Sequence, residues 1–320
     1  MNPPIGVILA AGRGQRMMPF SQIWPKPLLP VGNRPVLFHQ IQHMKNLGIS
    51  KIFIVVSHLS DEIRQVIEQK SIAEWSELVD DIEIKFIEQG ETQGIAHAVG
   101  CLEASIQEPF LLFLGDIVFQ HRGFDKMIEK MGGNEPGAVL AIKREADEEA
   151  LRRNFCVIQD ENGLVTRVIE KPRYPPTQLK GCGIYYFHPV VFDAVRRTPK
   201  THLRGEYELT DTIQILIDDG YPVYGVDIIE EDLNLTSPRD ILLANQNYLR
   251  LIEKSVLIDC DARIDPKASY HEVCVGPRAE VVGEVHLERV VVFPDAVVDR
   301  DLHDALVTRE QIVFISENKP

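Results

Sequence analysis

Residues 9–28 read LAAGRGQRMMPFSQIWPKPL and contain the strongest signal in this chain of 320 residues. The apolar run IGVILA leads directly into Gly12 and Gly14, as a buried parallel strand leads into a ligand-binding loop. Glycines at such a turn let the backbone approach a ligand and point its amide N–H groups toward it. Arg16 and Lys26 add two cations, so the loop suits a triphosphate, whose several negative charges must be bound together.

Two commoner phosphate-binding motifs are excluded by the same residues. A P-loop requires GxxxxGK followed by Ser or Thr, and the sequence lacks this pattern. The dinucleotide-binding fingerprint requires a third glycine, and Met17 stands at its position. The glycines, the arginine and the later Pro-Lys-Pro therefore predict another kind of nucleotide site.

The first half of the chain alternates apolar runs with helical patterns. We expect strands at residues 5–10, 51–56, 82–87 and 110–114, and helices at residues 36–47, 61–70 and 94–104. This alternation predicts an α/β fold with a Rossmann-like, doubly wound, mixed sheet. Ligands of such sheets bind beyond the carboxyl ends of the strands, so the loops that start at Ala11, Gln89 and Gly115 are expected to lie close together.

The middle of the chain has a different pattern. Residues 155–159 and 165–170 flank Asp-Glu-Asn-Gly, which predicts a β-hairpin. Residues 183–187 are expected to form another strand, and residues 210–219 and 238–253 two helices. Ser237 and Pro238 suit the N-cap and the first turn of the second helix.

The last part of the chain repeats a short motif. Residues 264–268 (IDPKA), 275–279 (VGPRA) and 292–296 (VFPDA) each place Pro and Ala after an aliphatic residue, without helical spacing. This pattern resembles the hexapeptide repeat of left-handed β-helices, in a segment long enough for about three coils. The alternative is a β-rich tail folded on the core. We expect a catalytic domain at 1–253 and a short β-helix-like domain at 254–320, whose exposed end favours assembly into a homo-oligomer.

Composition excludes several functional classes. The net charge is −14, from 34 basic and 48 acidic residues, which argues against a nucleic-acid partner because phosphate backbones require clustered Lys and Arg. The five cysteines form no CxxC pair, and an odd count predicts reduced thiols in the cytoplasm. We expect no signal peptide and no membrane partner, since neither a basic leader nor a long apolar run is present.

The loop and the motifs that follow it resemble the sugar-phosphate nucleotidyltransferase family, which includes thymidylyl-, uridylyl- and guanylyltransferases of sugar 1-phosphates. The family signature is Leu-Ala-(Ala/Gly)-Gly-x-Gly-(Ser/Thr)-Arg followed by Pro-Lys-Pro. The resemblance spans about residues 5–250. It implies that an NTP and a sugar 1-phosphate are the substrates, and that Ala10, Ala11, Gly12 and Gly14 bind the nucleotide.

The resemblance also implies roles for later residues. The stretch from Gln89 to Ala98 is similar to the family's Gln…Gly-Thr-Ala-x-Ala, which assigns contacts with the base to Gln89 and Gly94. Glu-Lys-Pro at residues 170–172 assigns sugar hydroxyls to Glu170 and the sugar phosphate to Lys171. Gly183, Cys156 and Glu206 fall at further landmarks of the sugar pocket.

Two residues are implied as ligands of Mg²⁺. Asp116 follows the strand at 110–114, and Asn234 stands before the Ser-Pro helix start, where the family shows Asp or Asn. Oxygen ligands and shared phosphate oxygens suit Mg²⁺. The structural alternative for Asn234 is an ordinary Asn in a turn before a helix. The structural alternative for Gln89 is a solvated loop residue.

The implied reaction is in-line attack by a sugar 1-phosphate oxygen on the α-phosphorus of the NTP. Lys171 would hold the nucleophile, Arg16 the departing β- and γ-phosphates, and Lys26 the charge near the α-phosphate. A general base is not required, because the sugar phosphate is already an anion.

Three departures from the family pattern concern the substrates. Gln15 replaces the usual Ser or Thr, Cys156 stands where many members have Gly, and Gly181 where several have Asn. The base and the sugar therefore stay open, with UTP or dTTP favoured over GTP or CTP. A non-catalytic regulatory relative, and cytidylyl transfer to a phosphocholine-like acceptor near Tyr185, Tyr186 and Trp24, are the alternative functions.

Overall fold

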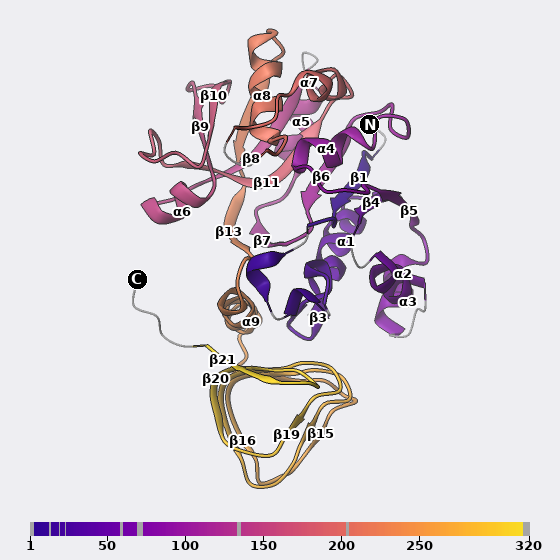
Figure 1. The fold of residues 1–320 in the computed structure, drawn as a ribbon, viewed down its shortest axis with the longest axis vertical. Helices are drawn as coiled ribbons and strands as arrows, with labels where there is room; N and C mark the ends of the chain where they lie inside the picture. Colours follow the sequence, from indigo (N-terminus) through magenta and orange to yellow (C-terminus); the bar gives the residue numbers. More distant parts are fainter. Residues whose placement is uncertain are drawn as a thin grey trace. The chain divides into compact units, whose positions relative to one another are not determined.

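The structure, a computed structural model, describes residues 3–315 except 13, 19, 23, 58–59, 69–72, 133–135 and 203–204. The side chains of residues 15, 22, 73 and 74 also lie outside the description. The chain divides into two compact units, each considered by itself (Figure 1). Unit 1 contains Met1–Arg13 and Gln40–Asp232, and unit 2 contains Gly14–His39 and Leu233–Pro320.

Unit 1 is built around a mixed sheet whose path runs β10-β9-β11-β6-β1-β4-β5, with β8 pairing to β11 and β12 to β8. Strand β1 runs parallel to β4 and β6, and β4 runs parallel to β5, as the alternation of strands and helices predicts. Strand β11 runs antiparallel to β6, so the sheet is mixed. The strands are β1 (Ile5–Leu9), β4 (Lys51–Val56), β5 (Glu83–Glu88), β6 (Phe110–Leu114), β8 (Ala138–Arg144), β9 (Phe155–Gln159), β10 (Val165–Glu170), β11 (Leu179–Phe187) and β12 (Val223–Asp227).

The helices of unit 1 agree with the expected ones where the helical pattern is long. Those that the sequence predicted are α1 (Val36–Asn46), which continues from unit 2, α2 (Ser60–Glu68), α4 (Ile95–Gly100) and α8 (Leu209–Asp218). Helix α4 ends earlier than expected, at Gly100, and turns follow it. Short elements that the patterns did not predict are α3 (Ala73–Val79), β7 (Ile117–His121), α5 (Asp125–Met131), α6 (Glu148–Arg153) and α7 (Val191–Arg197).

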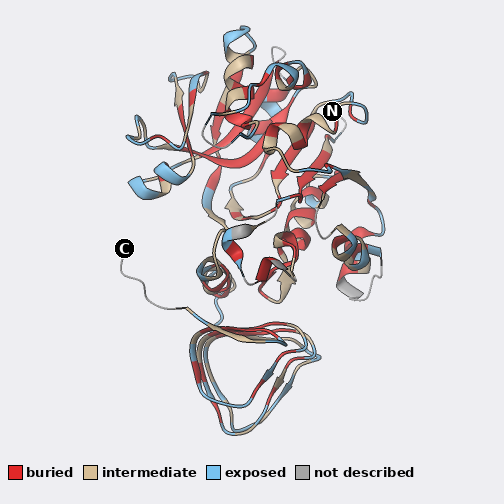
Figure 2. Cartoon of the chain, viewed as in Figure 1, coloured by how far each residue is buried: buried red, intermediate tan, exposed pale blue. Residues whose placement is uncertain are grey.

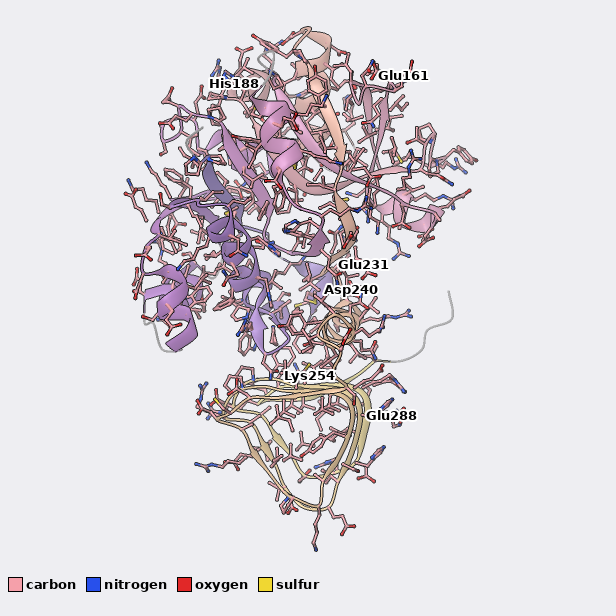
Figure 3. All side chains as sticks on the ribbon, turned by 180° about the vertical axis from the view of Figure 1, so that it is seen from behind. Glu161, His188, Glu231, Asp240, Lys254 and Glu288 are labelled. Carbon is pink, nitrogen blue, oxygen red and sulfur yellow. The ribbon has the colours of Figure 1, made fainter. Side chains whose placement is uncertain are left out.

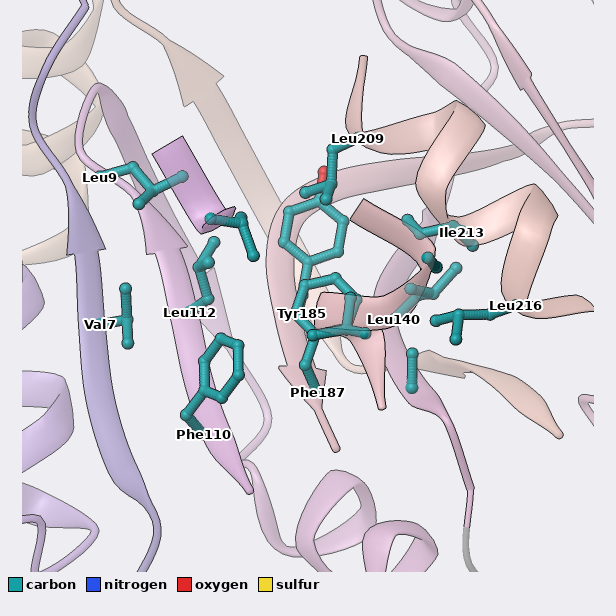
Figure 4. Packing of buried hydrophobic residues seen from close by; sticks show 14 of the residues in the cluster. Val7, Leu9, Phe110, Leu112, Leu140, Tyr185, Phe187, Leu209, Ile213 and Leu216 are labelled. Atoms are coloured by element: carbon teal, nitrogen blue, oxygen red, sulfur yellow. The ribbon is translucent and has the colours of Figure 1, made fainter. Parts of the chain in front are cut away.

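One hydrophobic core of unit 1 lies between the sheet and helices α4, α7 and α8. Figure 4 shows Val7, Leu112 and Tyr185 on neighbouring strands, and Ile213 and Leu216 of α8 packed toward them. Strands such as β1 and β6 are buried along nearly their whole length (Figure 2), which explains why they are continuous apolar runs in the sequence.

The expected hairpin forms from β9 and β10, which pair antiparallel. The Asp160 carboxylate accepts hydrogen bonds from the backbone N–H groups of Asn162 and Leu164, both at 2.8 Å. Gly163 adopts a φ of 81°, a conformation that glycine adopts without strain. Glu161 projects from the turn into solvent (Figure 3).

Unit 2 contains a stack of parallel coils with a triangular outline (Figure 1). Val256 pairs with Val273, Val273 with Val290, and Val290 with Ala305, so successive coils advance by 17, 17 and 15 residues. One wall consists of β14 (Val256–Ile258), β16 (Ser269–Val275), β18 (His286–Val292), β20 (Leu302–Val307) and the antiparallel β21 (Ile312–Phe314). A second wall consists of β15 (Arg263–Ile264), β17 (Glu280–Val281) and β19 (Val297–Val298).

The coils have a hydrophobic core of their own, which includes Val275, Val281, Val292 and Leu302. Charged side chains such as Glu288 lie on the outside of the stack (Figure 3). The coils therefore form a structure with its own hydrophobic core, which the alternative of a β-rich tail folded on the core does not include.

The remaining part of unit 2 is α9 (Pro238–Leu251) together with the segment from Gly14 to His39. This segment contains three short 3-10 turns, η1 (Gln15–Met17), η2 (Phe20–Gln22) and η3 (Lys26–Leu28), and the small β2 (Pro30–Val31) and β3 (Arg34–Pro35) pair. As the sequence predicted, α9 begins at Ser237 and Pro238, and the Asp240 carboxylate accepts a 2.7 Å hydrogen bond from the Ser237 backbone N–H. Among the described helices, we find none that is both long enough and apolar enough to span a membrane.

Two half-buried histidines are expected to make the stability of the fold depend on pH. In unit 1, the backbone N–H of Gly123 donates to Nδ1 of His121 at 2.9 Å, so the neutral ring of His121 carries its hydrogen on Nε2. That Nε2 lies 3.1 Å from Nδ1 of His43 and donates to it. Burial lowers the pKa of His121, although Glu230 opposes this effect. In unit 2, burial lowers the pKa of His39, although a hydrogen bond to the Val31 carbonyl opposes it.

We expect the protein to lose stability as the pH falls through about 6.5, the ordinary pKa of histidine. Both folded-state pKa values lie below the unfolded ones, so the unfolded chain binds protons first and is favoured. The midpoint of urea unfolding, measured from pH 8 to pH 5, should fall in this window, and His121→Gln should make the fall smaller. An unchanged slope in this variant would show that His121 does not contribute.

Candidate functional site

The carboxyl ends of the parallel strands of unit 1 lie at one edge of the sheet. Leu9 pairs with Leu114 and with Val55, and Val56 pairs with Glu88. The loops that follow are tied to this edge, since Ser57 Oγ donates to the Ala11 carbonyl at 2.9 Å. The expected grouping of the loops after β1, β5 and β6 is therefore present, with Ala10, Ala11 and Gly12 at its centre.

The Gly115-Asp116 turn is pressed against the end of β1. The backbone N–H of Gly115 donates to the Leu9 carbonyl at 2.9 Å. A Cβ at Gly115 would lie 2.6 Å from the same carbonyl oxygen, so only glycine fits. This contact fixes the half-buried Asp116 at the strand edge, beside the start of the glycine-rich loop.

The residues assigned to the base form one hydrogen-bonded loop. Gln89 is 7% exposed, and its Nε2 lies 3.2 Å from the Gly94 carbonyl and 3.1 Å from Nδ1 of His97. The Ala96 backbone N–H donates to the Tyr207 carbonyl at 3.0 Å. At Gly94 φ is 110°, and a Cβ there would lie 2.5 Å from the Tyr207 carbonyl oxygen. Gln89 is thus a buried, ordered residue, which argues against the solvated-loop alternative.

Replacing Gly94 by alanine should weaken binding of the nucleotide. Backbone strain of about 1–3 kcal/mol is expected where a side chain is forced into such a conformation, which corresponds to a KM for the NTP raised roughly tenfold or more if the loop must move. Gly90→Ala is the matched control, because Gly90 also has positive φ but its Cβ would meet no atom within 4 Å. Equal KM values for the two variants would contradict the role of this contact.

The residues assigned to the sugar phosphate follow the hairpin. Lys171, with φ 42°, donates its backbone N–H to the Asn154 carbonyl at 2.9 Å. Its Nζ lies 2.9 Å from Glu170 Oε1, and Thr210 Oγ1 donates to Glu170 Oε2 at 3.3 Å. The 37% exposed ammonium and the 24% exposed carboxylate are thus held together but accessible to a ligand.

Further acidic residues lie close to Glu170, and the sequence motifs do not indicate them. Burial raises the pKa of Asp211, and the negative charge of Glu170 raises it further. Glu208 is buried, whereas Glu206, the residue assigned from the sequence, is exposed. Side chains two residues apart on an extended segment share a face, so the sequence period does not separate Glu206 from Glu208. Glu208 differs because it is the N-cap residue of α8.

Two unusual residues of the sugar landmarks have a packing explanation. A Cβ at Gly181 would lie 1.8 Å from Cζ of Phe155, so the Phe155 ring fills the space that a side chain at 181 would need. This ring stacks on Tyr185, with centroids 6.2 Å apart and an interplanar angle of 13°. Cys156 is buried, and its Sγ lies 3.9 Å from the Thr177 carbonyl, so only its backbone is left for contact with a sugar.

Gly183 of β11 packs against residues that flank the Gly115-Asp116 turn. Its φ is 68°, and a Cβ there would lie 2.2 Å from Ile117 Cδ1 and 3.0 Å from Leu114 Cδ1. Leu114 and Ile117 flank the Gly115-Asp116 turn, so Gly183 brings β11 against the turn that carries Asp116. Gly183 is thus a packing contact beneath the site.

Unit 2 carries the other candidate residues. Gly14 has φ 60°, and a Cβ there would lie 3.1 Å from Lys26 Cε, so the loop folds back and brings Lys26 onto Gly14. Arg16 is exposed within η1. Asn234 is the last residue of β13 (Ile229–Asn234), just before the capped start of α9. The side chain of Gln15 lies outside the described residues.

The donor types fit a hard divalent cation. Asp116 offers carboxylate oxygens and Asn234 an amide oxygen, and Mg²⁺ prefers such ligands together with phosphate oxygens and water. Among the described residues, the one group of three metal-binding side chains within reach of one another is Asp259, Cys260 and Asp261 on the coils.

A mixed α/β sheet with a glycine-rich loop, a carboxylate and a lysine at its strand ends defines a nucleotide-binding transferase of the α/β class. The chain belongs to the nucleotidyl transferase family, whose model matches residues 5–249. Members of this family generally depend on a divalent metal.

Known relatives agree with this membership. The low-salt glycan biosynthesis nucleotidyltransferase of Haloferax volcanii is 33% identical over 272 residues, which cover 83% of this chain and 72% of the relative. The UTP–glucose-1-phosphate uridylyltransferase of the same organism is 31% identical, over 73% of this chain and 92% of the relative. The glucose-1-phosphate thymidylyltransferase of Streptomyces antibioticus is 30% identical, over 87% of this chain and 72% of the relative.

A solved structure shares the fold. The structure of a UDP-glucose pyrophosphorylase complexed with UDP-glucose superposes with a TM-score of 0.68 at 19% identity, covering 78% of this chain and 99% of that one.

Proposed function

We infer that this protein transfers a nucleoside monophosphate from an NTP to a sugar 1-phosphate, giving an NDP-sugar and pyrophosphate. One structural feature carries this inference. It is the start of the glycine-rich loop and the Asp116 turn, which meet at the strand edge of unit 1, together with the Glu170–Lys171 pair that follows β10 of the same sheet. The relatives named for uridylyl and thymidylyl transfer to glucose 1-phosphate support the same reaction.

The charges of the loop and the hairpin suit the two phosphate substrates. Lys171 would release Glu170 when the sugar phosphate arrives, so the ammonium holds the phosphate and the carboxylate accepts sugar hydroxyls. Arg16 and Lys26 would neutralise the triphosphate, whose β- and γ-phosphates leave as pyrophosphate. Because the nucleophile is an anion, its positioning beside the α-phosphorus is the main requirement.

Mg²⁺ is the divalent cation that we propose, held by Asp116 and Asn234. When bound, it would lower the negative charge shared by the two phosphate substrates. Asp116 is suited to this role by its fixed position at the end of β6, beside the carbonyl of Leu9.

The two substrates are proposed as classes. Gln89 and Gly94 are suited to the edge of a pyrimidine, and UTP and dTTP are the first candidates. The phosphocholine alternative loses its support, because Tyr185 is 3% exposed and stacks between Phe155 and Phe187 instead of lining an aromatic cage. A non-catalytic regulatory relative is expected to have lost charged residues of the proposed site. This chain keeps all of them, namely Arg16, Lys26, Asp116 and Lys171.

A matrix of NTPs against sugar 1-phosphates, with Mg²⁺ and a pyrophosphate assay, tests the function. We expect pyrophosphate release that requires both substrates, fastest with UTP or dTTP. Release that needs no sugar phosphate, or that occurs with phosphocholine alone, would contradict the proposal.

The coils of unit 2 are proposed to be left-handed and to mediate assembly of a homo-oligomer in the cytoplasm. The exposed Val282 and Val297 beside the second wall support assembly. The free cysteines agree with a reducing compartment such as the cytoplasm. A monomeric mass by light scattering at micromolar concentration would count against assembly.

A further inference from the structure

The described residues between the two proposed phosphate-binding cations, Arg16 and Lys26, lie mainly in the short turns η1, η2 and η3. Hydrogen bonds close these turns, such as Met17 N–H to the Gly14 carbonyl and Trp24 N–H to the Phe20 carbonyl, both 2.8 Å. Short 3-10 turns contribute little stability. Contacts with other parts of unit 2 must therefore hold the loop in one conformation.

An aromatic residue of the coils makes such a contact. Phe293 is fully buried at the corner between β18 and β19. Its ring stacks on Phe20, with centroids 5.5 Å apart and an interplanar angle of 22°, and meets Trp24 edge-on at 5.7 Å. The Phe293 backbone N–H donates to the Val307 carbonyl at 2.8 Å, which ties this corner to the next coil. Phe20 and Trp24 lie between Arg16 and Lys26 in the sequence.

The repeat motif itself marks Phe293 as exceptional. In the three repeats, the position before Pro is Asp265, Gly276 and Phe293. A Cβ at Gly276 would already lie 3.0 Å from the backbone nitrogen of Pro294, so a large side chain does not fit there. The coil architecture therefore does not require an aromatic residue at this corner. The contact with Phe20 and Trp24 explains why Phe293 is present there.

The downstream end of the same segment is also anchored within unit 2. Asn33 Nδ2 donates to the Val275 carbonyl of the coils at 2.8 Å. The Gly32 backbone N–H donates to Asn245 Oδ1 of α9 at 2.9 Å, and Asn245 Nδ2 donates to the Pro30 carbonyl at 2.9 Å. The coils and α9 thus hold the segment on both sides of Lys26.

We propose that Phe293 is a positioning residue for the triphosphate loop, and that the coils hold the segment from Arg16 to Lys26 in its NTP-binding conformation. This role rests on the proposed function and is separate from assembly. It predicts that damage to the coil corner weakens binding of the NTP, while the sugar 1-phosphate, bound by Glu170 and Lys171 of unit 1, is little affected.

The full-length Phe293→Ala variant tests the role by steady-state kinetics. If one tenth of the molecules keep the loop in its binding conformation, the KM for the NTP rises about tenfold, and the KM for the sugar 1-phosphate changes less than about twofold. Phe293→Leu should fall between Phe293→Ala and the wild type. Phe314→Ala, which removes an aromatic ring that is 62% exposed on the same coils, is the control and should resemble the wild type.

Limited trypsin digestion supplies a readout that does not depend on activity. Cleavage after Arg16 should be faster in Phe293→Ala than in Phe314→Ala, and saturating NTP should slow this cleavage. Lys26 precedes Pro27 and therefore resists trypsin.

If Phe293→Ala does not fold, Phe293→Leu and the loop-side variant Phe20→Leu are measured in its place. Unchanged cleavage and an unchanged KM for the NTP in a folded variant would overturn the proposal. A wild-type protein without sugar-dependent pyrophosphate release would instead overturn the proposed function, and the cleavage rates would still test the loop contact.

Discussion

Replacing Lys171 by alanine should lower the rate of pyrophosphate release by about 10²–10³-fold, the usual loss when one preorganised electrostatic group is removed from an active site. The Lys171 ammonium is the cation beside Glu170 at the end of the hairpin, 2.9 Å from its carboxylate. Without this ammonium group, the negative charges of the sugar phosphate and of the triphosphate would repel each other more strongly. The effect should be seen in kcat/KM for the sugar 1-phosphate, measured with the NTP saturating.

Arg173→Ala is the matched control for this prediction. Arg173 is an exposed cation two residues further along the same loop, and it lies over the Tyr174 ring. Its loss changes the net charge equally but should leave the rate within about threefold, since exposed charges contribute little. Equal rates for the two variants would remove Lys171 from the mechanism.

Replacing Asp232 by asparagine should cost about 3–5 kcal/mol of folding stability, the range for removing one partner from a buried ion pair. The Asp232 side chain is 2% exposed, and its Oδ1 lies 2.7 Å from Lys180 Nζ and 3.2 Å from Lys143 Nζ. Glu145 would then be the acidic partner left, 3.1 Å from Lys143 and 3.8 Å from Lys180. The buried ammonium group of Lys180 and the partly buried one of Lys143 would then share one carboxylate, so the midpoint of urea unfolding should fall sharply.

The exposed pair of Arg278 and Asp295 provides the contrast. These side chains are 57% and 46% exposed and lie 2.7 Å apart. Asp295→Asn should therefore cost less than about 1 kcal/mol. If both asparagine variants unfold at the same urea concentration, burial of the Asp232 cluster does not contribute the expected stability.

The elements that sequence predicted well are those with local signals. Strands β4 and β6 begin and end at the expected residues, because buried parallel strands are uninterrupted apolar runs. The hairpin of β9 and β10 is also as expected, since Asp160 and Gly163 determine the turn. The helices α5, α6 and α7 have six or seven residues each, too few for a helical period to show.

The candidate site was predictable where motifs follow strands and not where distant segments pack together. Gln89 and Asp116 follow parallel strands, so the direction of these strands determines their edge. Lys171 follows β10, which runs opposite to β6, and only the Glu-Lys-Pro motif indicated it. The contact of Phe20 with Phe293 joins segments at opposite ends of the chain, and no local pattern indicates it. The choice between Glu206 and Glu208 likewise depends on which side chain faces the interior.

Isotope transfer tests the proposed reaction most directly. The substrate is a sugar 1-phosphate that carries ¹⁸O in all non-bridging phosphate oxygens, turned over with UTP or dTTP, and the products are measured by mass spectrometry. Attack by this phosphate on the α-phosphorus keeps all of the label in the NDP-sugar and leaves pyrophosphate unlabelled. Label in pyrophosphate, or release of free phosphate without an NDP-sugar, would contradict nucleotidyl transfer by this protein.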